Sequence, residues 1–342
     1  MSRFIDVNIT DDTTPISQAG FGLGFILDPV ESEMDEYDYT EIMDLEDVPE
    51  NASELAEDMV NQYLSQTPNP GNVAIQGVYI DGTDGTAEDV GDALDQVVEE
   101  NNDWYGLLLA SREQTEIEEA DDWVPANKLF ITSPVEPSWD ELKEYDLLSD
   151  KTGSFPHTEE REYDAAIMSK MFTTDPGSAT WKWQELSGVD SSGYPSAEVS
   201  SMLDPDEGEP TMNPMIYEMG VDYTAEGKNV NGGYLDIQRT IDWLEARLTE
   251  NIFGLMINND KIPYDNSGIA QVKAKMKEIF KQATNRGIVV IEDGEALWNI
   301  DAPEREDVPT NDRANRVLPD VNFNLTAAGA IHEVDISGAV KV

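Results

Sequence analysis

The chain has 342 residues, with 71 acidic and 21 basic side chains, a formal net charge of −50 and no cysteine. Nucleic-acid binding through a basic surface is excluded, because phosphate contacts need clustered Lys and Arg. Disulfides, thiolate catalysis and Cys-ligated metals are excluded as well. No apolar run approaches the roughly 20 residues of a membrane span, and the first residues lack the apolar stretch of a signal peptide. We therefore expect a soluble, globular, cytoplasmically made protein of roughly two domains.

The negative charge is spread along the whole chain. Residues 4–111 contain no Lys or Arg, and thirteen acidic residues lie between Glu31 and Asp58, interleaved with apolar ones. Such one-signed charge repels itself in a compact fold, but at ~1 M salt the Debye length falls to ~3 Å and screens the repulsion. An acidic tail for partner binding would carry its charge in one block. The pattern therefore favours adaptation to molar salt.

The first half of the chain alternates strand and helix patterns. An N-terminal strand is predicted from Ile5, Val7 and Ile9, which share one face. We interpret the glycine-rich segment 20–27 as flexible backbone, because Phe25 replaces the third glycine of a dinucleotide-binding motif. The further predicted elements are a helix over 53–65, strands over 73–80, 104–110 and 128–132, and helices over 86–101, 113–123, 139–148 and 161–172. This order predicts an α/β fold in which a βαβ layered sheet is flanked by helices.

The second half contains a turn-rich segment, 187–215, which we expect to be an exposed loop or a domain boundary. Long amphipathic helices are predicted over 237–255 and from an N-cap at 265–267 to residue 285, followed by a strand over 287–291. The last stretch, 330–342, alternates again. We expect four parts: an N-terminal arm over 1–22, an α/β domain over 23–200, an inner helical domain over 201–327 and a C-terminal arm strand over 328–342.

No catalytic, metal or cofactor site is predicted. The chain has only two histidines, His157 and His332, and without cysteine or a third histidine a transition-metal site is not expected. Paired carboxylates are too abundant in this composition to indicate acid–base catalysis.

One segment departs from the acidic background. Six basic and only two acidic residues lie between Lys261 and Arg286. On the predicted helix, Lys273, Lys277 and Lys281 follow one another at i, i+4 and i+8 beside an apolar face. This basic stripe could be an ordinary solvated face, but in so acidic a protein we favour an acidic partner surface.

Several segments together carry a family resemblance. They are GFGLGFIL, residues 66–70, NNDWYGLLLAS, Lys128-Leu129-Phe130, DPGSATWKWQELSGV, EGKNVNGGYLDIQRTIDWLEARL, KIPYDNSGI and AGAIHEVDISGAVKV. From about residue 20 onward the chain resembles the tail sheath protein of contractile-tailed, myovirus-like viruses. The most specific part is 226–287, with Gly233, Asp236, Arg239, 242–244 and 261–264 in place. The acidic segment 31–58 and the low lysine content depart from the family, as expected for a virus of a halophilic archaeal host.

The resemblance implies a structural protein of the virion tail and not an enzyme. Sheath subunits stack as hexameric rings around a tail tube, contract on a baseplate signal and drive the tube through the host envelope, so that the genome can be ejected. The implied partners are further copies of the chain, the tail tube protein, and baseplate and tail terminator proteins. We expect Lys273, Lys277 and Lys281 to face the tube. The inter-subunit strands are expected to use Ile5, Val7, Ile9, Val334, Ile336, Val340 and Val342.

Two alternatives remain at this point. The first is a halophilic α/β enzyme that uses carboxylates in a cleft of the βαβ layer. The second is another contractile-tail component, such as a tube or baseplate protein, although tube proteins are usually shorter and richer in strands.

The charge pattern predicts that folding needs high salt. Raising KCl from about 0.1 M to about 3 M should raise the thermal unfolding midpoint, because screening relieves repulsion between surface carboxylates. The acidic N-terminal half should loosen first as salt is removed. A midpoint that is equal at the two salt concentrations would contradict this expectation.

Overall fold

The computed structural model describes residues 20–81, 86–334 and 337, so the strand expected at Ile5, Val7 and Ile9 lies outside the described residues. The contacts within the chain define two compact units. We call residues 20–243, together with the segment from 329 onward, the α/β unit. Residues 244–328 form the C-terminal unit.

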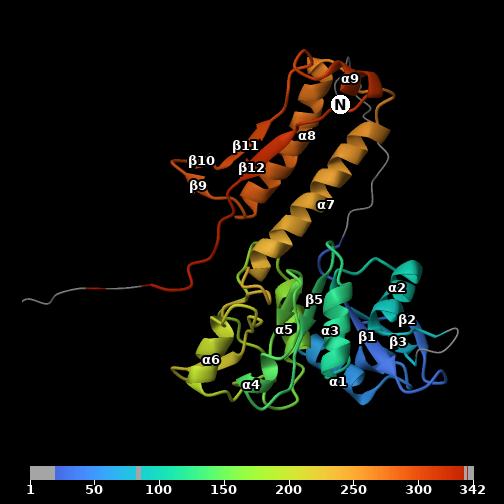
Figure 1. Ribbon diagram of the computed structural model, residues 1–342, viewed down its shortest axis with the longest axis vertical. Helices are drawn as coiled ribbons and strands as arrows, with labels where there is room; N and C mark the ends of the chain where they lie inside the picture. The colour runs from blue at the N-terminus through green and yellow to red at the C-terminus, as the bar shows by residue number, and fades with distance from the viewer. Residues whose placement is uncertain (1–19, 82–85, 335–336, 338–342) are drawn as a thin grey trace, which may run out of the picture. The chain divides into compact units, whose positions relative to one another are not determined.

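The α/β unit is built on a six-stranded sheet (Figure 1). Five strands are parallel and the edge strand β2 is antiparallel to its neighbour. In spatial order the strands are β2 (Tyr37–Ile42), β3 (Val73–Tyr79), β1 (Gly24–Val30), β4 (Gly106–Leu109), β5 (Leu129–Thr132) and β6 (Thr152–Ser154). This arrangement confirms the predicted α/β fold class.

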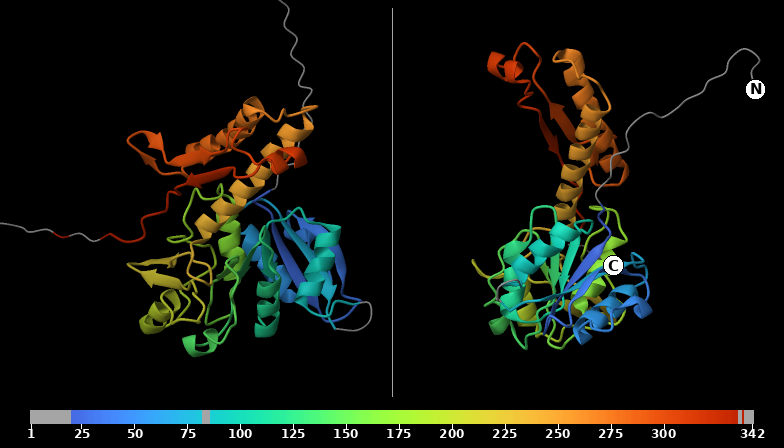
Figure 2. Two further views of the ribbon diagram at one scale, coloured as in Figure 1. Left: turned by 45° about the horizontal axis from the view of Figure 1, so that its top comes forward. Right: turned by 90° about the vertical axis from the view of Figure 1, so that its right-hand side faces the viewer.

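Helices cover both faces of the sheet, as Figure 2 shows. α1 (Glu54–Leu64) and α5 (Tyr163–Phe172) pack on one face, and α2 (Val90–Glu100) and α3 (Gln114–Trp123) on the other. Successive side chains of a strand point to opposite faces, and in β1 Phe25 and Leu27 enter one core while Ile26 enters the other. All three are fully buried. The central strands are therefore apolar on both faces, as parallel strands between two helical layers usually are.

The interpretation of the glycine-rich segment as flexible backbone was wrong for its second half. Residues from Gly24 onward form β1, which pairs with both β3 and β4 near the centre of the sheet. Glycine is needed in this region for close packing: a Cβ atom on Gly106, opposite Gly24, would lie 2.5 Å from the Phe172 ring of α5. The glycines therefore let α5 approach the sheet.

The rest of the α/β unit consists of short elements. They are η1 (Leu45–Asp47), α4 (Trp139–Leu142), α6 (Ser196–Leu203) and the hairpin of β7 (Met215–Glu218) and β8 (Val221–Thr224). The helix predicted over 139–148 ends at Leu142, and the buried Tyr145 and Leu147 follow in an irregular segment. The turn-rich segment 187–215 contains α6 and lies within the unit.

The C-terminal unit is formed around two long helices. α7 (Leu235–Ile257) begins in the α/β unit and continues into the C-terminal unit, and α8 (Asn266–Asn285) follows. Both helices confirm the prediction. The division between the units falls after Trp243, whereas the sequence suggested residue 201, because residues 201–243 pack with the α/β sheet.

Short strands complete the C-terminal unit. They are β9 (Ile291–Glu292), β10 (Glu295–Ala296), β11 (Trp298–Asp301) and β12 (Asn322–Leu325), with α9 (Thr310–Asn315) before β12. The Phe280 ring of α8 lies 5.5 Å from Trp298 and 5.1 Å from Phe323, centroid to centroid. The strand expected over 287–291 is reduced to its last residue, and Val289 makes an isolated bridge with Ala327 instead.

The first turns of α7 are fixed to the sheet by a buried arginine. The Arg239 side chain, 1% exposed, donates from Nη1 to the Met171 carbonyl (2.8 Å) and from Nη2 to the Phe21 carbonyl (3.0 Å). Its guanidinium carbon lies 4.9 Å from the Phe172 ring centroid. The Arg239 clamp therefore joins the segment before β1 to the end of α5, because one guanidinium donates hydrogen bonds to carbonyl groups of both.

An acidic partner lies one turn further along α7. Asp242, 5% exposed, accepts hydrogen bonds from the Tyr105 hydroxyl (2.7 Å) and from Gln238 (3.0 Å), and it pairs with Lys151. Burial, and next the Asp242 charge, raise the pKa of Tyr105 well above its ordinary value, so the hydroxyl stays a donor.

Replacing the clamp should destabilise the α/β unit strongly. Arg239→Met would remove the guanidinium hydrogen bonds to the Met171 and Phe21 carbonyls and the contact with the Phe172 ring, at a cost of about 3 kcal/mol. Urea unfolding in molar KCl measures this change, with Lys170→Met as the control, since Lys170 donates only to the exposed Thr67 carbonyl. The clamp is unimportant if the two variants lose equal stability.

Candidate functional site

The segment 226–234, which leads into α7, is held by side-chain amides. Asn229, 4% exposed, accepts from the Gly233 and Asn231 amides (2.7 and 3.1 Å) and donates to the Asp150 carbonyl (2.9 Å). Asn213 bonds to both the amide and the carbonyl of Lys228. The asparagines of the pattern EGKNVNGG are thus explained, because hydrogen bonds of the Asn229 side chain fix the shape of this loop before α7 begins.

The start of this loop also contacts the C-terminal segment of the chain. Glu226 pairs with Lys182, and its second carboxylate oxygen lies 3.3 Å from Nδ1 of His332. Nε2 of His332 lies 2.8 Å from the Thr180 hydroxyl, and the ring packs edge-on against Tyr234. Burial alone would raise the pKa of Glu226, but the contacts with Lys182 and His332 outweigh it and lower that pKa. His332 is therefore the point at which the C-terminal segment is attached to the α/β unit.

The KIPYDNSG segment sets the beginning of α8. Asp265 caps the helix by accepting from the amides of Ser267 (2.9 Å) and Gly268 (3.1 Å). A Cβ atom on Gly268 would lie 1.9 Å from the Pro263 carbonyl oxygen, so no larger residue fits without moving the loop. The hydrogen bond from the Ser267 hydroxyl is the largest of the contacts that lower the pKa of Asp265, so the cap stays ionised at neutral pH.

The predicted basic stripe lies on α8. Lys277 and Lys281 are exposed and Lys273 is half-buried. The apolar residues of the same helix, Ile269, Met276, Ile279, Phe280 and Ala283, are buried. Lys275 pairs with Glu278, but none of the three stripe lysines forms an ion pair with any residue that the structure describes. The structure thus brings the three together on one accessible helix face.

The residues expected in inter-subunit strands are only partly described. Val334 is 68% exposed and lies outside any helix or strand. Ile336, Val340 and Val342 lie outside the described residues, as do Ile5, Val7 and Ile9. Their pairing stays a prediction.

Two carboxylates near the place where an α/β enzyme would bind its substrate make structural contacts. In such sheets ligands bind beyond the carboxyl ends of the strands where the strand order reverses. There Asp28, fully buried near the end of β1, accepts through Oδ2 from the Tyr37 hydroxyl (2.7 Å) and the Ser53 amide (2.9 Å). Arg112, after β4, pairs with the buried Asp164 of α5 at 2.8 Å. These carboxylates have structural partners.

The two histidines do not form a common site. His157 is 2% exposed, accepts from the Glu159 amide (3.0 Å) and contacts the Asp190 carbonyl through its other ring nitrogen. Burial is the main cause that lowers its pKa. Within the described ranges no cluster of three or more His, Asp or Glu side chains could hold a metal ion. In the same residues no helix is both long and apolar enough to cross a membrane.

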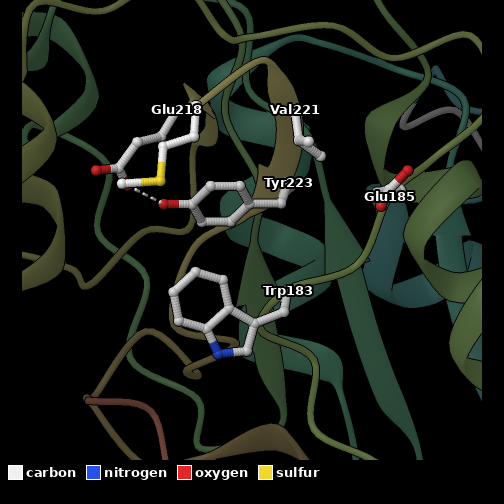
Figure 3. Close-up of a pocket in the computed structure, with 6 residues that line it drawn as sticks. Trp183, Glu185, Glu218, Val221 and Tyr223 are labelled. Carbon is white, nitrogen blue, oxygen red and sulfur yellow. Dashed lines mark hydrogen bonds between the residues drawn. The ribbon is translucent and has the colours of Figure 1, made fainter. Parts of the chain in front are cut away.

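A site that sequence reasoning missed is a pocket of about 480 Å³ beside the β7–β8 hairpin, drawn in Figure 3. It is lined by Trp183, Glu185, Glu218, Met219, Val221 and Tyr223. The alternation of aromatic and acidic residues over 215–224 was the available signal, but the surrounding turn residues obscured it.

Comparisons with known proteins agree with the family resemblance. Residues 235–340 match the family model described as "E217 tail sheath protein gp31-like, C-terminal domain". No curated protein matches the sequence.

Solved structures match over nearly the whole chain. The contracted helical sheath of the anti-feeding prophage has a TM-score of 0.69 at 14% identity and covers 99% of each chain. The contracted sheath complex of an extracellular contractile injection system, PVC, has a TM-score of 0.71 at 9% identity, covering 100% of this chain and 99% of that one. A chain of the anti-feeding prophage baseplate gives 0.68 at 12%, covering both chains fully. The chain therefore has the fold of contractile sheath proteins, and its residues 235–340 are similar to a tail sheath C-terminal domain.

Proposed function

We propose that the chain is the structural subunit of a contractile viral tail sheath. The observation that carries the proposal is the likeness of fold over the full length to contractile sheath chains, together with the tail sheath model over 235–340. In this function, copies assemble in the host cytoplasm as hexameric rings stacked around a tail tube, between a baseplate and a terminator. Contraction drives the tube through the envelope of a halophilic host and allows genome ejection.

The enzyme alternative has less support. Its active site would use free carboxylates at the carboxyl ends of the strands, but Asp28 and Asp164 are buried there with hydrogen-bond or ion-pair partners. Burial and a neighbouring carboxylate raise the pKa of Tyr105 and of Tyr37, and both hydroxyls donate to that carboxylate as structural hydrogen bonds. These features are what a structural subunit needs.

The basic stripe of α8 supplies the proposed contact with the tube. Lys273, Lys277 and Lys281 have no ion-pair partners among the described residues and are carried by a helix whose adjacent apolar face is packed in a core. Long-range attraction is screened in molar salt, so the contacts with an acidic tube must be short ion pairs helped by burial.

Reversing the charge of the stripe should separate tube binding from self-assembly. The triple variant Lys273→Glu, Lys277→Glu, Lys281→Glu should still form sheath polymers but bind purified tubes at least about tenfold more weakly, which corresponds to about 1.4 kcal/mol. Co-sedimentation with tubes measures the binding.

The matched control reverses three partly exposed basic residues of the α/β unit, Lys143, Arg161 and Lys170. It makes the same change in net charge and should retain tube binding. If both triple variants bind tubes equally well, the stripe is only a solvated helix face.

The segment from Ala328 onward is proposed to join neighbouring subunits. Ile331 and Val334 are 81% and 68% exposed, although apolar side chains normally favour burial. The β11–β12 sheet has two strands, and no third strand joins it within the described residues. An open sheet edge can accept an added strand through main-chain hydrogen bonds.

Removing this segment should abolish polymers and leave the fold intact. Truncation after Ala327 removes the hydrogen bond from the Ala328 amide to the Ile288 carbonyl (2.7 Å) and the His332 contacts. It leaves β11, β12 and all the long helices. Electron microscopy in about 3 M KCl should show tubes or rings for the full chain and dispersed monomers for the truncated one. Polymers of the truncated chain would refute the role of the segment, and a full chain that forms only small oligomers would refute the proposed function.

A further inference from the structure

The tip of the β7–β8 hairpin carries apolar residues that the fold does not use. Trp183, Tyr217 and Met219 are 48%, 61% and 97% exposed. Exposed apolar clusters of this kind commonly mark contact sites. In a chain of net charge −50, an apolar surface also differs sharply from the acidic surface that the rest of the protein needs to stay hydrated.

The backbone at this place is unfavourable for the residues that occupy it. Met219 and Gly220 form the turn between β7 and β8 with φ values of 52° and 93°. Such two-residue turns favour Asn-Gly, because L-residues with long side chains rarely adopt positive φ. Trp183 also has a positive φ, 68°. Two large apolar side chains in left-handed conformations, both exposed, indicate a surface kept for contact and not for folding.

The pocket has a chemistry that can be matched to a ligand. The rings of Trp183 and Tyr223 lie 4.8 Å apart and form its floor with Val221, while the carboxylates of Glu218 and Glu185 stand on its rim (Figure 3). Glu218 accepts a hydrogen bond from the Tyr223 hydroxyl at 2.7 Å, which fixes both groups. Aromatic faces and carboxylates together suit aliphatic side chains that accompany a cation.

The C-terminal segment of the same chain begins beside this pocket. His332 contacts Glu226, Glu226 pairs with Lys182, and the Lys182 ammonium lies 4.8 Å from the Trp183 ring centroid. His332, three residues before Asp335 in the sequence, is therefore linked to the pocket through Glu226 and Lys182. Eight residues span about 27 Å when extended, which is ample for this distance.

The composition of that segment fits the pocket. It contains Ile336, Val340 and Val342, and Lys341 is the only Lys or Arg after Arg316. The aliphatic side chains suit the aromatic floor, and the Lys341 ammonium suits the acidic rim. We propose that residues 335–342 dock into the β7–β8 pocket of their own chain in the free subunit.

Such docking can be weak and still be populated. A short tether gives the segment an effective concentration on the order of millimolar, so a contact with a Kd in that range is about half occupied. The docked form would shield both the pocket and the segment until a neighbouring subunit competes for them. This consequence for assembly rests on the proposed sheath function, whereas the docking itself does not.

The absence of cysteine allows a direct test. In dilute protein at about 3 M KCl, the double variant Met219→Cys, Val340→Cys should oxidise mainly to an intramolecular disulfide, read as a monomeric mass on a non-reducing gel and by mass spectrometry. The control is Met43→Cys, Val340→Cys. Met43 is 68% exposed and follows β2, which lies at one edge of the sheet. The β7–β8 hairpin is linked to the other edge, because the Ser154 carbonyl of β6 accepts from the Asn213 amide just before β7. Met43 is therefore an exposed methionine far from the pocket.

Each outcome decides the proposal. Docking in the same chain is supported by an intramolecular disulfide yield at least about fivefold above that of the Met43 control. Lys341→Glu should lower this yield, and adding Glu185→Lys with Glu218→Lys should restore it. Disulfide-linked dimers as the main product would assign the pocket to a second copy and overturn the proposal, as would a yield equal to that of the control. Tube formation by the cysteine-free parent is scored separately by microscopy, so failure of the docking proposal and failure of the sheath function can be told apart.

Discussion

The buried guanidinium of Arg239 is the interaction on which the arrangement of the chain depends. One side chain supplies donors to carbonyl groups of two segments that are far apart in sequence, before β1 and at the end of α5, and it comes from the first turns of α7. Because hydrogen bonds from a charged donor are stronger than neutral ones, the buried guanidinium holds these three segments together. The helix that continues into the C-terminal unit thus begins from a fixed point in the α/β unit.

The scarcity of basic residues gives each of them diagnostic value. Lys128 is buried, its ammonium lies 3.7 Å from the Trp104 ring centroid, and burial lowers its pKa to about 8. Arg112, Lys151 and Lys182 neutralise partly or fully buried carboxylates. Against this background, a lysine that is neither buried against an aromatic ring nor paired with a carboxylate among the described residues requires another explanation. The stripe on α8 contains three such lysines.

Elements with a clear period could be predicted from the sequence, and those without one could not. The N-cap candidates at 265–267 and the apolar spacing locate α8, which begins after Asp265 and ends at the expected Asn285. β1 was not predicted because its Gly24 serves close packing against Tyr63 of α1 and Met168 of α5, which lie far along the chain. The β7–β8 pocket escaped for a similar reason, since Trp183 and Tyr223 meet only after the chain folds. The motif 226–244 could be recognised as a sequence pattern. The hydrogen bonds from its Arg239 to the Met171 and Phe21 carbonyls could not be predicted from the neighbouring sequence.

The packing of α8 has a consequence for any partner of its lysines. The apolar face beside the stripe is buried, with Phe280 near both Trp298 and Phe323, and Gly268 lets the first turn pack against Pro263. The direction in which the lysines project is thus set when the C-terminal unit folds. Preorganisation of this kind removes most of the backbone ordering cost from later association. In a polymer of many identical subunits that saving recurs at every copy, so contacts that are individually weak can add up to a firm attachment.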